Sequence, residues 1–167
     1  MTFYGSVVEA DSYHSARGNT AWANGTNADK EAALLRASEY IDARYESMWT
    51  GWPVNRRAQI RNWPRSAAYD IYGDLILENE IPTEIEDATY ELALIELVTP
   101  GKLNPVVTMS DRKTSVSVEG AVSVTYANTS GIESYRPVVT VVDGILAPLM
   151  AGDGAKSSLA GRMTRSY

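Results

Sequence analysis

The chain has no cysteine and only one histidine, His14, among its 167 residues. Without cysteine it can form no disulfide, no thiolate zinc site and no thiol nucleophile. Any Ser-His-Asp arrangement would have to be built around His14, which lies in a segment with the pattern of an ordinary helix. We therefore expect a packing or surface role for His14, and we expect that the protein is not an enzyme.

Long apolar runs and phosphate-binding glycine motifs are also missing. No apolar stretch approaches the ~20 residues of a membrane span. The first thirteen residues lack the basic start and apolar core of a signal peptide. Neither G-x-G-x-x-G nor G-x-x-x-x-G-K-[ST] occurs. We expect a soluble, intracellularly made protein without a cofactor and without a membrane partner.

Positive charge is scarce over one long stretch of the chain. The formal net charge is −6. Residues 66–101 contain nine acids and no Lys or Arg, whereas residues 55–65 contain four Arg and no acid. Strong acidity disfavours a protein whose main task is to hold nucleic acid, because phosphate neutralisation supplies most non-specific affinity. A local basic loop could still bind it.

The most informative segment that is present is the connector, which we define as residues 49–65. It holds three of the four tryptophans, two Trp-Pro steps and four arginines. A residue before proline is pushed out of the α region, so both steps break helices. Three indoles this close favour burial, because each buried aromatic removes roughly 150–250 Å² from water. The connector is thus either a packed structural plug or a recognition loop.

Two sets of connector residues follow from these alternatives. The aromatic and proline anchors would fix the segment, and they are Trp49, Trp52, Trp63 and Pro64. The four basic side chains are Arg56, Arg57, Arg61 and Arg65. We expect these arginines to pair with the acids between Asp70 and Glu96, within one subunit or between subunits. As a recognition loop, the segment would instead stack nucleic-acid bases on its indoles and hold phosphates with its arginines.

Glu84, Asp87 and Glu91 have the three- and four-residue spacing that places side chains on one helix face. Such a face could hold a carboxylate pair or a divalent metal. Acids in a first helical turn are also favoured by the helix dipole alone. We prefer the second explanation, expect no metal site, and assign these three acids to charge contacts between subunits.

Local signals predict a mainly α fold, a small helical bundle with a β-hairpin and an extended C-terminal tail. Ser6-x-x-Glu9 and Thr83-x-x-Glu86 have the form of capping boxes that begin helices. The predicted elements are a helix from Ser6 to Gly18, a polar loop over 18–27 with Trp22, a helix from about Ala28 to Glu46, a loop over 66–81, and a helix from Thr83 to Val98.

The last third of the chain changes period. Alternating valines predict a hairpin at about 112–127, and a three-residue loop gathers them on one face. Val138–Leu149 fits a helical stripe that begins at Pro137, although its β-branched start also fits a strand. We expect one domain over 1–150 and a flexible tail over 151–167.

Several motifs taken together resemble a known family. They are Ser6-Val7-x-Glu9-Ala10-Asp11-x-Tyr13, Arg17-Gly18, Trp22, Ala32-Ala33-Leu34-x-Arg36-Ala37, Tyr40-Ile41-Asp42, Trp49-x-Gly51, Gln59-x-x-x-Trp63-Pro64-Arg65-Ser66, Gly73, Ile81-Pro82, Arg136-Pro137 and Ala147-Pro148-Leu149. Over roughly residues 6–150 the chain resembles a tailed-phage family often labelled "DnaT-like single-stranded DNA-binding protein". Its members look like head–tail connector adaptors. The Trp-Pro-Arg block with the upstream Ala-Leu-x-Arg-Ala helix is fairly specific.

The resemblance implies a structural role in the virion neck, after assembly in the host cytoplasm. Twelve copies would form a ring beneath the portal protein and meet further neck or tail-completion proteins. Double-stranded DNA would pass through the lumen without specific binding, which an acidic channel would favour. The tail would dock on the portal through Lys156, Arg162, Arg165 and Tyr167. The alternative is a single-stranded DNA-binding protein that uses residues 49–65.

Overall fold

The computed structural model describes residues 2–104 and 139–150. The predicted hairpin at 112–127 and the tail at 151–167 lie outside these residues. The described helices are α1 (Val7–Ala16), α2 (Thr20–Ala23), α3 (Asn27–Tyr45), α4 (Thr83–Val98) and α5 (Thr140–Leu146), with single 3-10 turns η1 (Glu46–Met48), η2 (Arg56–Ala58) and η5 (Ala147–Leu149). The strands are β1 (Trp52–Pro53), β2 (Arg65–Ser66), β3 (Ala68–Tyr69) and β4 (Leu75–Ile76). The prediction of a mainly α fold is confirmed.

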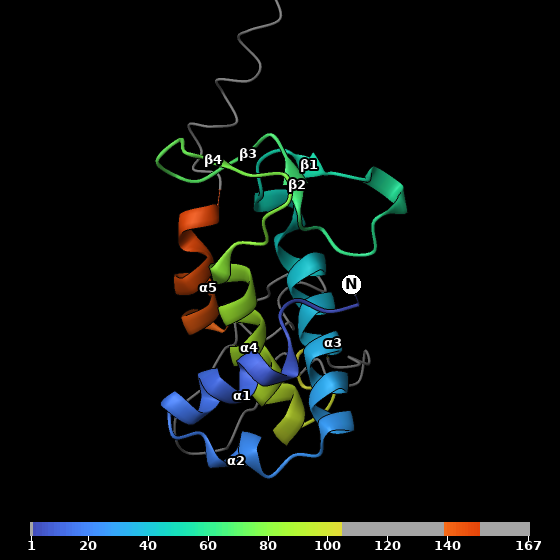
Figure 1. Ribbon diagram of the computed structural model, residues 1–167, viewed down its shortest axis with the longest axis vertical. Helices are drawn as coiled ribbons and strands as arrows, with labels where there is room; N and C mark the ends of the chain where they lie inside the picture. Colours follow the sequence, from blue (N-terminus) through green and yellow to red (C-terminus); the bar gives the residue numbers. More distant parts are fainter. Residues whose placement is uncertain (1, 105–138, 151–167) are drawn as a thin grey trace, which may run out of the picture.

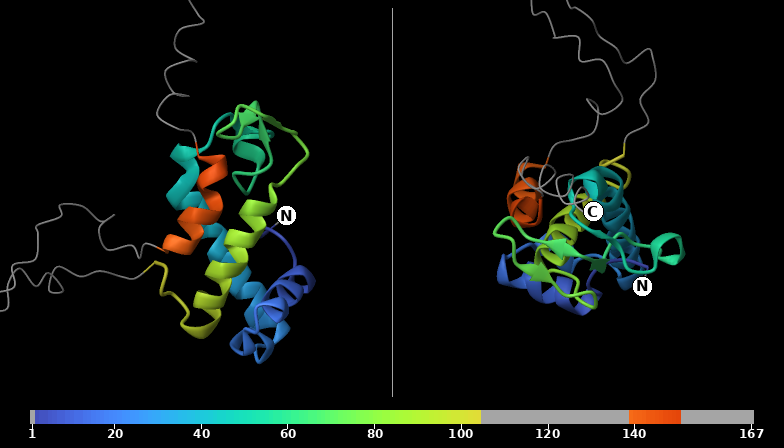
Figure 2. Two further views of the ribbon diagram at one scale, coloured as in Figure 1. Left: turned by 90° about the vertical axis from the view of Figure 1, so that its left-hand side faces the viewer. Right: turned by 90° about the horizontal axis from the view of Figure 1, so that it is seen from above.

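Three helices stand side by side along the long axis of the molecule. α3 runs up this axis, α4 runs down beside it, and α5 packs against α4 on the other side (Figures 1 and 2). Leu34, Ala37 and Ile41 of α3 are fully buried, as are Ile85 and Leu92 of α4. The apolar stripes that predicted these two helices therefore meet in one core.

The N-termini of α1 and α4 are capped in different ways. Ser6 caps α1 as predicted, because its Oγ accepts a hydrogen bond from the Glu9 amide (3.2 Å) and donates one to Glu9 Oε2 (2.7 Å). At α4 the predicted capping box is wrong. Pro82 is the N-cap, and its carbonyl accepts from the Ile85 and Glu86 amides at 2.9 and 3.4 Å. Thr83 is thus already the first helical residue.

The polar loop predicted over 18–27 contains a helix. α2 forms one turn there, and its Trp22 is only 1% exposed. The His14 and Trp22 rings lie 4.5 Å apart between their centroids, so the single histidine is a packing residue. A four-residue helix is too short to show a period, and its position depends on the burial of Trp22.

The apolar stripe predicted over 138–149 begins with a helix, α5, and not with a strand. It begins at Thr140, later than predicted, after the N-cap Val139. The Tyr45 hydroxyl donates to Asp143 Oδ1, which joins α3 to α5. At the end of this segment, Met150 forms an isolated antiparallel bridge with Trp49. The start of the connector is therefore fixed by a segment about a hundred residues later in the chain.

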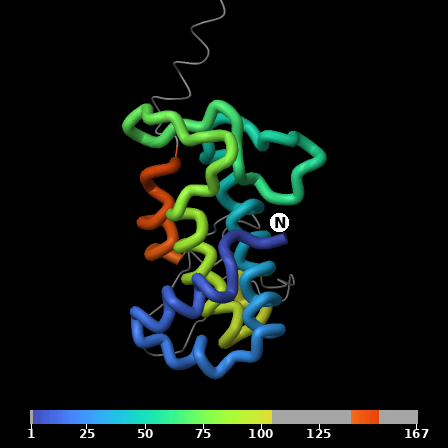
Figure 3. The backbone as a smooth tube through the Cα atoms, viewed as in Figure 1, coloured from blue at the N-terminus to red at the C-terminus, as the bar shows by residue number. Residues whose placement is uncertain are grey.

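Residues 49–82 form a layer of loops over one end of the helices (Figure 3). Two small antiparallel sheets order this layer. β1 pairs with β2, with Trp52 opposite Ser66, and β3 pairs with β4, with Ala68 opposite Ile76. Among the described residues, no helix combines the length and the apolar character needed to cross a bilayer. The layer carries most of the candidate binding residues.

Candidate binding surfaces

The three tryptophans of the connector do not share one environment. Trp49 and Trp63 are 6% and 2% exposed, and their rings meet edge to face with centroids 6.0 Å apart. Trp49 also packs on Tyr45 at the end of α3, with centroids 5.9 Å apart. Pro64 follows Trp63 through a cis peptide bond. Trp52, in contrast, is 39% exposed. Two indoles therefore fill the base of the layer, and one faces outward.

Arg61 is a buried cation with partners on α3. Its Nη1 lies 3.1 Å from Asp42 Oδ2, its Nη2 lies 3.7 Å from Glu39 Oε1, and its Nε donates to the Thr2 carbonyl at 2.8 Å. Within this chain Arg61 therefore pairs with Asp42 and Glu39, and not with the predicted acids between Asp70 and Glu96. Its carboxylate partners come before the connector in sequence, not after it.

Arg65 has no carboxylate partner in the described part of the chain. Its Nε and Nη2 donate to the carbonyls of Thr50 and Gly51, each at 2.8 Å. Burial lowers the pKa of Arg65. The predicted pairing with the downstream acids is therefore absent here too, because the side chain satisfies backbone acceptors of its own loop. Arg61 and Arg65 are inaccessible to a ligand phosphate.

Residues 52–62 form a projecting loop that carries the exposed side chains of the connector, and we call this loop the arm. Arg56 places its guanidinium carbon 4.5 Å from the Trp52 ring centroid, and Arg57 and Ile60 are also exposed. Gln59 holds the loop closed, since its amide donates to the Arg61 and Pro64 carbonyls at 2.8 and 2.9 Å. The arm thus presents one aromatic, one aliphatic and two basic side chains on an ordered loop.

The acids of α4 have several roles. Glu96 is buried and satisfies Arg36 Nε (2.7 Å) and the amides of Gly101 (2.7 Å) and Leu103 (2.9 Å), so it closes the end of the helix. Glu91 accepts from the Tyr13 hydroxyl at 2.9 Å and lies 3.7 Å from Arg17 Nε. These acids stabilise contacts within the chain.

Glu84 and Asp87 lie partly exposed near the start of α4. Burial raises the pKa of Asp87, Arg17 opposes this, and Glu84 and Glu91 raise it further. Within residues 2–104 and 139–150, no cluster of three or more His, Cys, Asp or Glu side chains has metal-binding geometry. The two acids are thus available for contact with another molecule.

An exposed apolar surface lies at the β3–β4 hairpin, and the sequence analysis missed it. Five of the twelve large hydrophobic side chains exposed in the described residues lie between positions 69 and 77. They are Tyr69 (42% exposed), Ile71 (49%), Tyr72 (80%), Leu75 (57%) and Leu77 (58%), and we call them the hairpin face. The density of Ile, Tyr and Leu over these few residues was the available signal. Clusters of exposed apolar side chains mark interaction sites.

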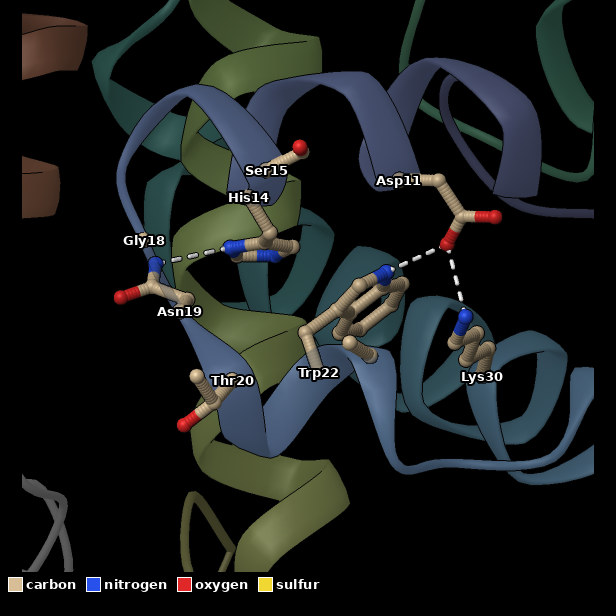
Figure 4. A pocket seen from close by; sticks show the side chains of 9 residues that line it. Asp11, His14, Ser15, Gly18, Asn19, Thr20, Trp22 and Lys30 are labelled. Atoms are coloured by element: carbon tan, nitrogen blue, oxygen red, sulfur yellow. Dashed lines mark hydrogen bonds and ion pairs between the residues drawn. The ribbon is translucent and has the colours of Figure 1, made fainter.

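A hollow of about 470 Å³ lies between α1, α2 and the start of α3. At its edge the Asp11 carboxylate accepts from Trp22 Nε1 (2.7 Å) and from Lys30 Nζ (2.8 Å), as Figure 4 shows. Lys30 holds the pKa of Asp11 below its usual range. His14 and Asn19 bond to each other at 3.0 Å. The buried Nε2 of His14 has no hydrogen-bond partner among the described residues. The contacts of Asp11 join three helices, so the hollow is structural.

The predicted docking residues Lys156, Arg162, Arg165 and Tyr167 lie outside the described residues. Comparison with known protein families gives a match over nearly the whole chain. The model of a family described as "Putative DnaT-like ssDNA binding protein" matches residues 3–166. No curated protein matches the chain, and neither does any solved structure. The family description names single-stranded DNA and says nothing of a virion.

Proposed function

The chain belongs to this DnaT-like family, and on the evidence of its surface we propose that it is a structural adaptor, a protein that joins other proteins. The observation that carries the proposal is the hairpin face, where large apolar side chains stand in solvent on an ordered loop. Exposing them lowers the solubility of a free monomer, and burial against a partner recovers the apolar contact. A protein-binding role explains them directly.

Charge supports the same proposal. The chain carries fifteen Lys and Arg against twenty-one Asp and Glu, a formal net charge of −6. Two of the four connector arginines are buried against internal acceptors. A body with this charge repels phosphate, so DNA could pass along it without being held. We propose that the chain acts in the head–tail connector of a tailed phage, as a ring beneath the portal protein, and its charge is consistent with that role.

The tail provides the sharpest test of this role. Within residues 151–167, Lys156, Arg162 and Arg165 stand against one acid, Asp153. We propose that this basic segment, with Tyr167, docks on the portal. Deleting residues 152–167 should abolish co-sedimentation with purified portal and leave the melting temperature within about 2 °C of the parent's. Co-sedimentation at the parent's level would contradict the tail's role.

A second candidate function is binding of single-stranded DNA, which the family description favours over a connector role. The arm offers the parts for it. An exposed indole can stack a base, and Arg56 and Arg57 can neutralise phosphates. Only the exposed part of the predicted connector would take part, since Trp49, Trp63, Arg61 and Arg65 are buried.

A salt titration separates the two functions. A single-stranded DNA-binding protein with two arginine contacts should lose affinity as salt rises, with a log–log slope of about −0.7 per phosphate contact. Trp52→Ala should also weaken binding by about 1–3 kcal/mol, as expected for one stacked base. Filter binding with an unstructured oligonucleotide measures both. No binding near physiological salt, or equal binding by parent and Trp52→Ala, would exclude the arm as a DNA site.

A further inference from the structure

We propose that the arm of one copy docks on the hairpin face of a second copy, in a head-to-tail contact. This inference rests on the proposed adaptor function and names the partner of the exposed surface. The occupant is another copy of this chain, because one molecule carries two surfaces of opposite charge, each with exposed apolar side chains.

The two surfaces point away from each other. In Figure 1 the arm, with η2, projects to one side of the loop layer, and the turn between β3 and β4 projects to the other. The view from above in Figure 2 shows the same separation. A molecule with this layout cannot close the contact on itself, but two copies placed side by side bring one arm to one hairpin face.

Charge on the two surfaces is complementary. Arg56 and Arg57 are exposed on the arm, and Asp74, Glu78 and Glu80 are exposed along the hairpin. Among the described residues, none of these five side chains takes part in an ion pair. Opposite potentials on facing surfaces fix orientation and disfavour like-to-like contacts of two arms or two hairpins. The contact is therefore heterologous.

Apolar area is available on both sides. Ile60 is 69% exposed and Trp52 39% exposed on the arm, and Tyr72 is 80% exposed on the hairpin. Indole and tyrosine rings with arginine are the side chains that contribute most to binding at protein interfaces. Burial of these side chains would supply the affinity, and the charges would supply the register.

Both loops are held in one conformation before any partner arrives. In the β3–β4 turn, Asp70 Oδ1 accepts from the Tyr72 and Asp74 amides, each at 2.8 Å. The Ile71 amide donates to the Pro148 carbonyl at 2.9 Å, which ties the turn to η5. Gln59 plays the same part in the arm. Ordered loops lose little conformational entropy on association.

A head-to-tail contact leaves one free arm and one free hairpin face at the ends of every open assembly. Each added copy repeats the same contact, so the series closes into a ring if the rotation permits and extends otherwise. An isologous pair would stop at two copies. This difference makes the proposal testable by mass alone.

The first measurement is sedimentation equilibrium of the parent across concentration, in low and moderate salt. We expect mass to rise with concentration beyond that of a dimer, and association to weaken as salt screens the charges. A parent that is monomeric up to about 500 μM in low salt overturns the proposal, because that corresponds to a Kd weaker than about 1 mM.

Two variants then test the surfaces separately. The arm variant carries Arg56→Ser and Arg57→Ser, and the hairpin variant carries Tyr72→Ser and Leu75→Ser. All four residues are exposed, so circular dichroism and melting should match the parent. We expect each variant alone to associate at least about tenfold more weakly, a change of 1.4 kcal/mol. Parent-like association by either variant overturns the proposal.

Mixing the two variants gives the decisive result. The arm variant keeps an intact hairpin face and the hairpin variant keeps an intact arm, so one normal contact can form between them. We expect a 1:1 complex that grows no further. A mixture that stays monomeric, or that grows beyond two copies, overturns the head-to-tail arrangement.

The outcomes also separate this proposal from the function on which it rests. Normal assembly of a parent that fails to bind portal would remove the adaptor role and keep the contact. Portal binding by a monomeric parent would keep the role and remove the contact. An arm variant that loses single-stranded DNA binding and keeps the parent's mass would assign the arm to DNA and overturn the contact.

Discussion

Asp42 joins three parts of the chain through one carboxylate. It accepts from the Tyr4 hydroxyl near the N-terminus, from Arg61 Nη1 at 3.1 Å and from the Asn62 amide at 3.2 Å. Burial raises its pKa, although all three donors act in the opposite direction. The carboxylate therefore holds the N-terminal segment, α3 and the arm together at one point.

Removing this carboxylate should be far more costly than removing its neighbour. Asp42→Ala removes the nearer and less exposed counter-charge of the buried Arg61 guanidinium and leaves only the exposed Glu39 carboxylate, and we expect a loss of about 3–5 kcal/mol of unfolding free energy. Glu39→Ala is the matched control. Glu39 is exposed and lies 3.7 Å from the same guanidinium, so its loss should be within about 1 kcal/mol. Urea unfolding measures both, and equal losses would contradict the assigned role of Asp42.

Gly51 is required because the backbone at this position lies directly against the carbonyl of Ser66, in β2. Its φ is +63°, and a Cβ there would lie 2.1 Å from the Ser66 carbonyl oxygen. Gly73, with φ +88° and nothing within 4 Å of a Cβ, is the control. Gly73→Ala should lose about 1–2 kcal/mol for the left-handed conformation alone. Gly51→Ala should lose about 1–3 kcal/mol more from the clash, in the same urea experiment. A smaller loss for Gly51→Ala would contradict the close approach.

At the scale of elements, the helices were predictable from local signals and the sheets were not. Ser6-x-x-Glu9 specified the start of α1, and the stop after Val98 followed from Pro100-Gly101. Each of the four strands is two residues long, too short for an alternating pattern. Their pairing depends on the packing of Trp49 and Trp63 beneath them, and packing of that kind has no local signature.

The first turns of α4 lie in an acidic environment with a measurable consequence. Burial raises the pKa of Glu86, and the charges of Glu9 and Asp87 raise it further. A raised folded pKa means that the folded state binds the proton more tightly, so stability falls as pH rises through that pKa.

Glu86→Gln removes the carboxyl group, and with it the loss of stability that accompanies its ionisation. We expect the variant to be more stable than the parent at pH 7, and the difference to vanish below the ordinary Glu pKa of about 4.3, where the parent's side chain is neutral in both states. Thermal melting from pH 3.5 to 7 checks this. Glu31→Gln, at an exposed position of α3, is the control for removal of one carboxylate from the surface. A difference that grows toward low pH would contradict the sign.

At the scale of the whole molecule, the sequence predicted which residues make up the connector. It did not predict which of them are exposed or which side chains they contact. The clustering of tryptophans predicted an anchored connector, but only the fold shows that Trp52 faces outward. The run of acids after residue 66 suggested partners for Arg61, whereas the actual carboxylate, Asp42, lies 19 residues before it. Charge counts along a chain give the sign of a patch, and tertiary packing decides which charges meet.

The overall charge gives a last prediction, in which salt acts on folding and on assembly with opposite signs. The parent's formal net charge is −6, and the arm variant has two arginines fewer, so raising salt should screen self-repulsion and raise the melting temperature of the monomeric arm variant by about 1–3 °C. The same salt should weaken association of the parent, because the arm and the hairpin attract by opposite charge. Melting and sedimentation between 20 and 300 mM NaCl measure the two effects. Salt that strengthened both folding and association would show that the contact is apolar alone, and the arginines of the arm would then have no part in it.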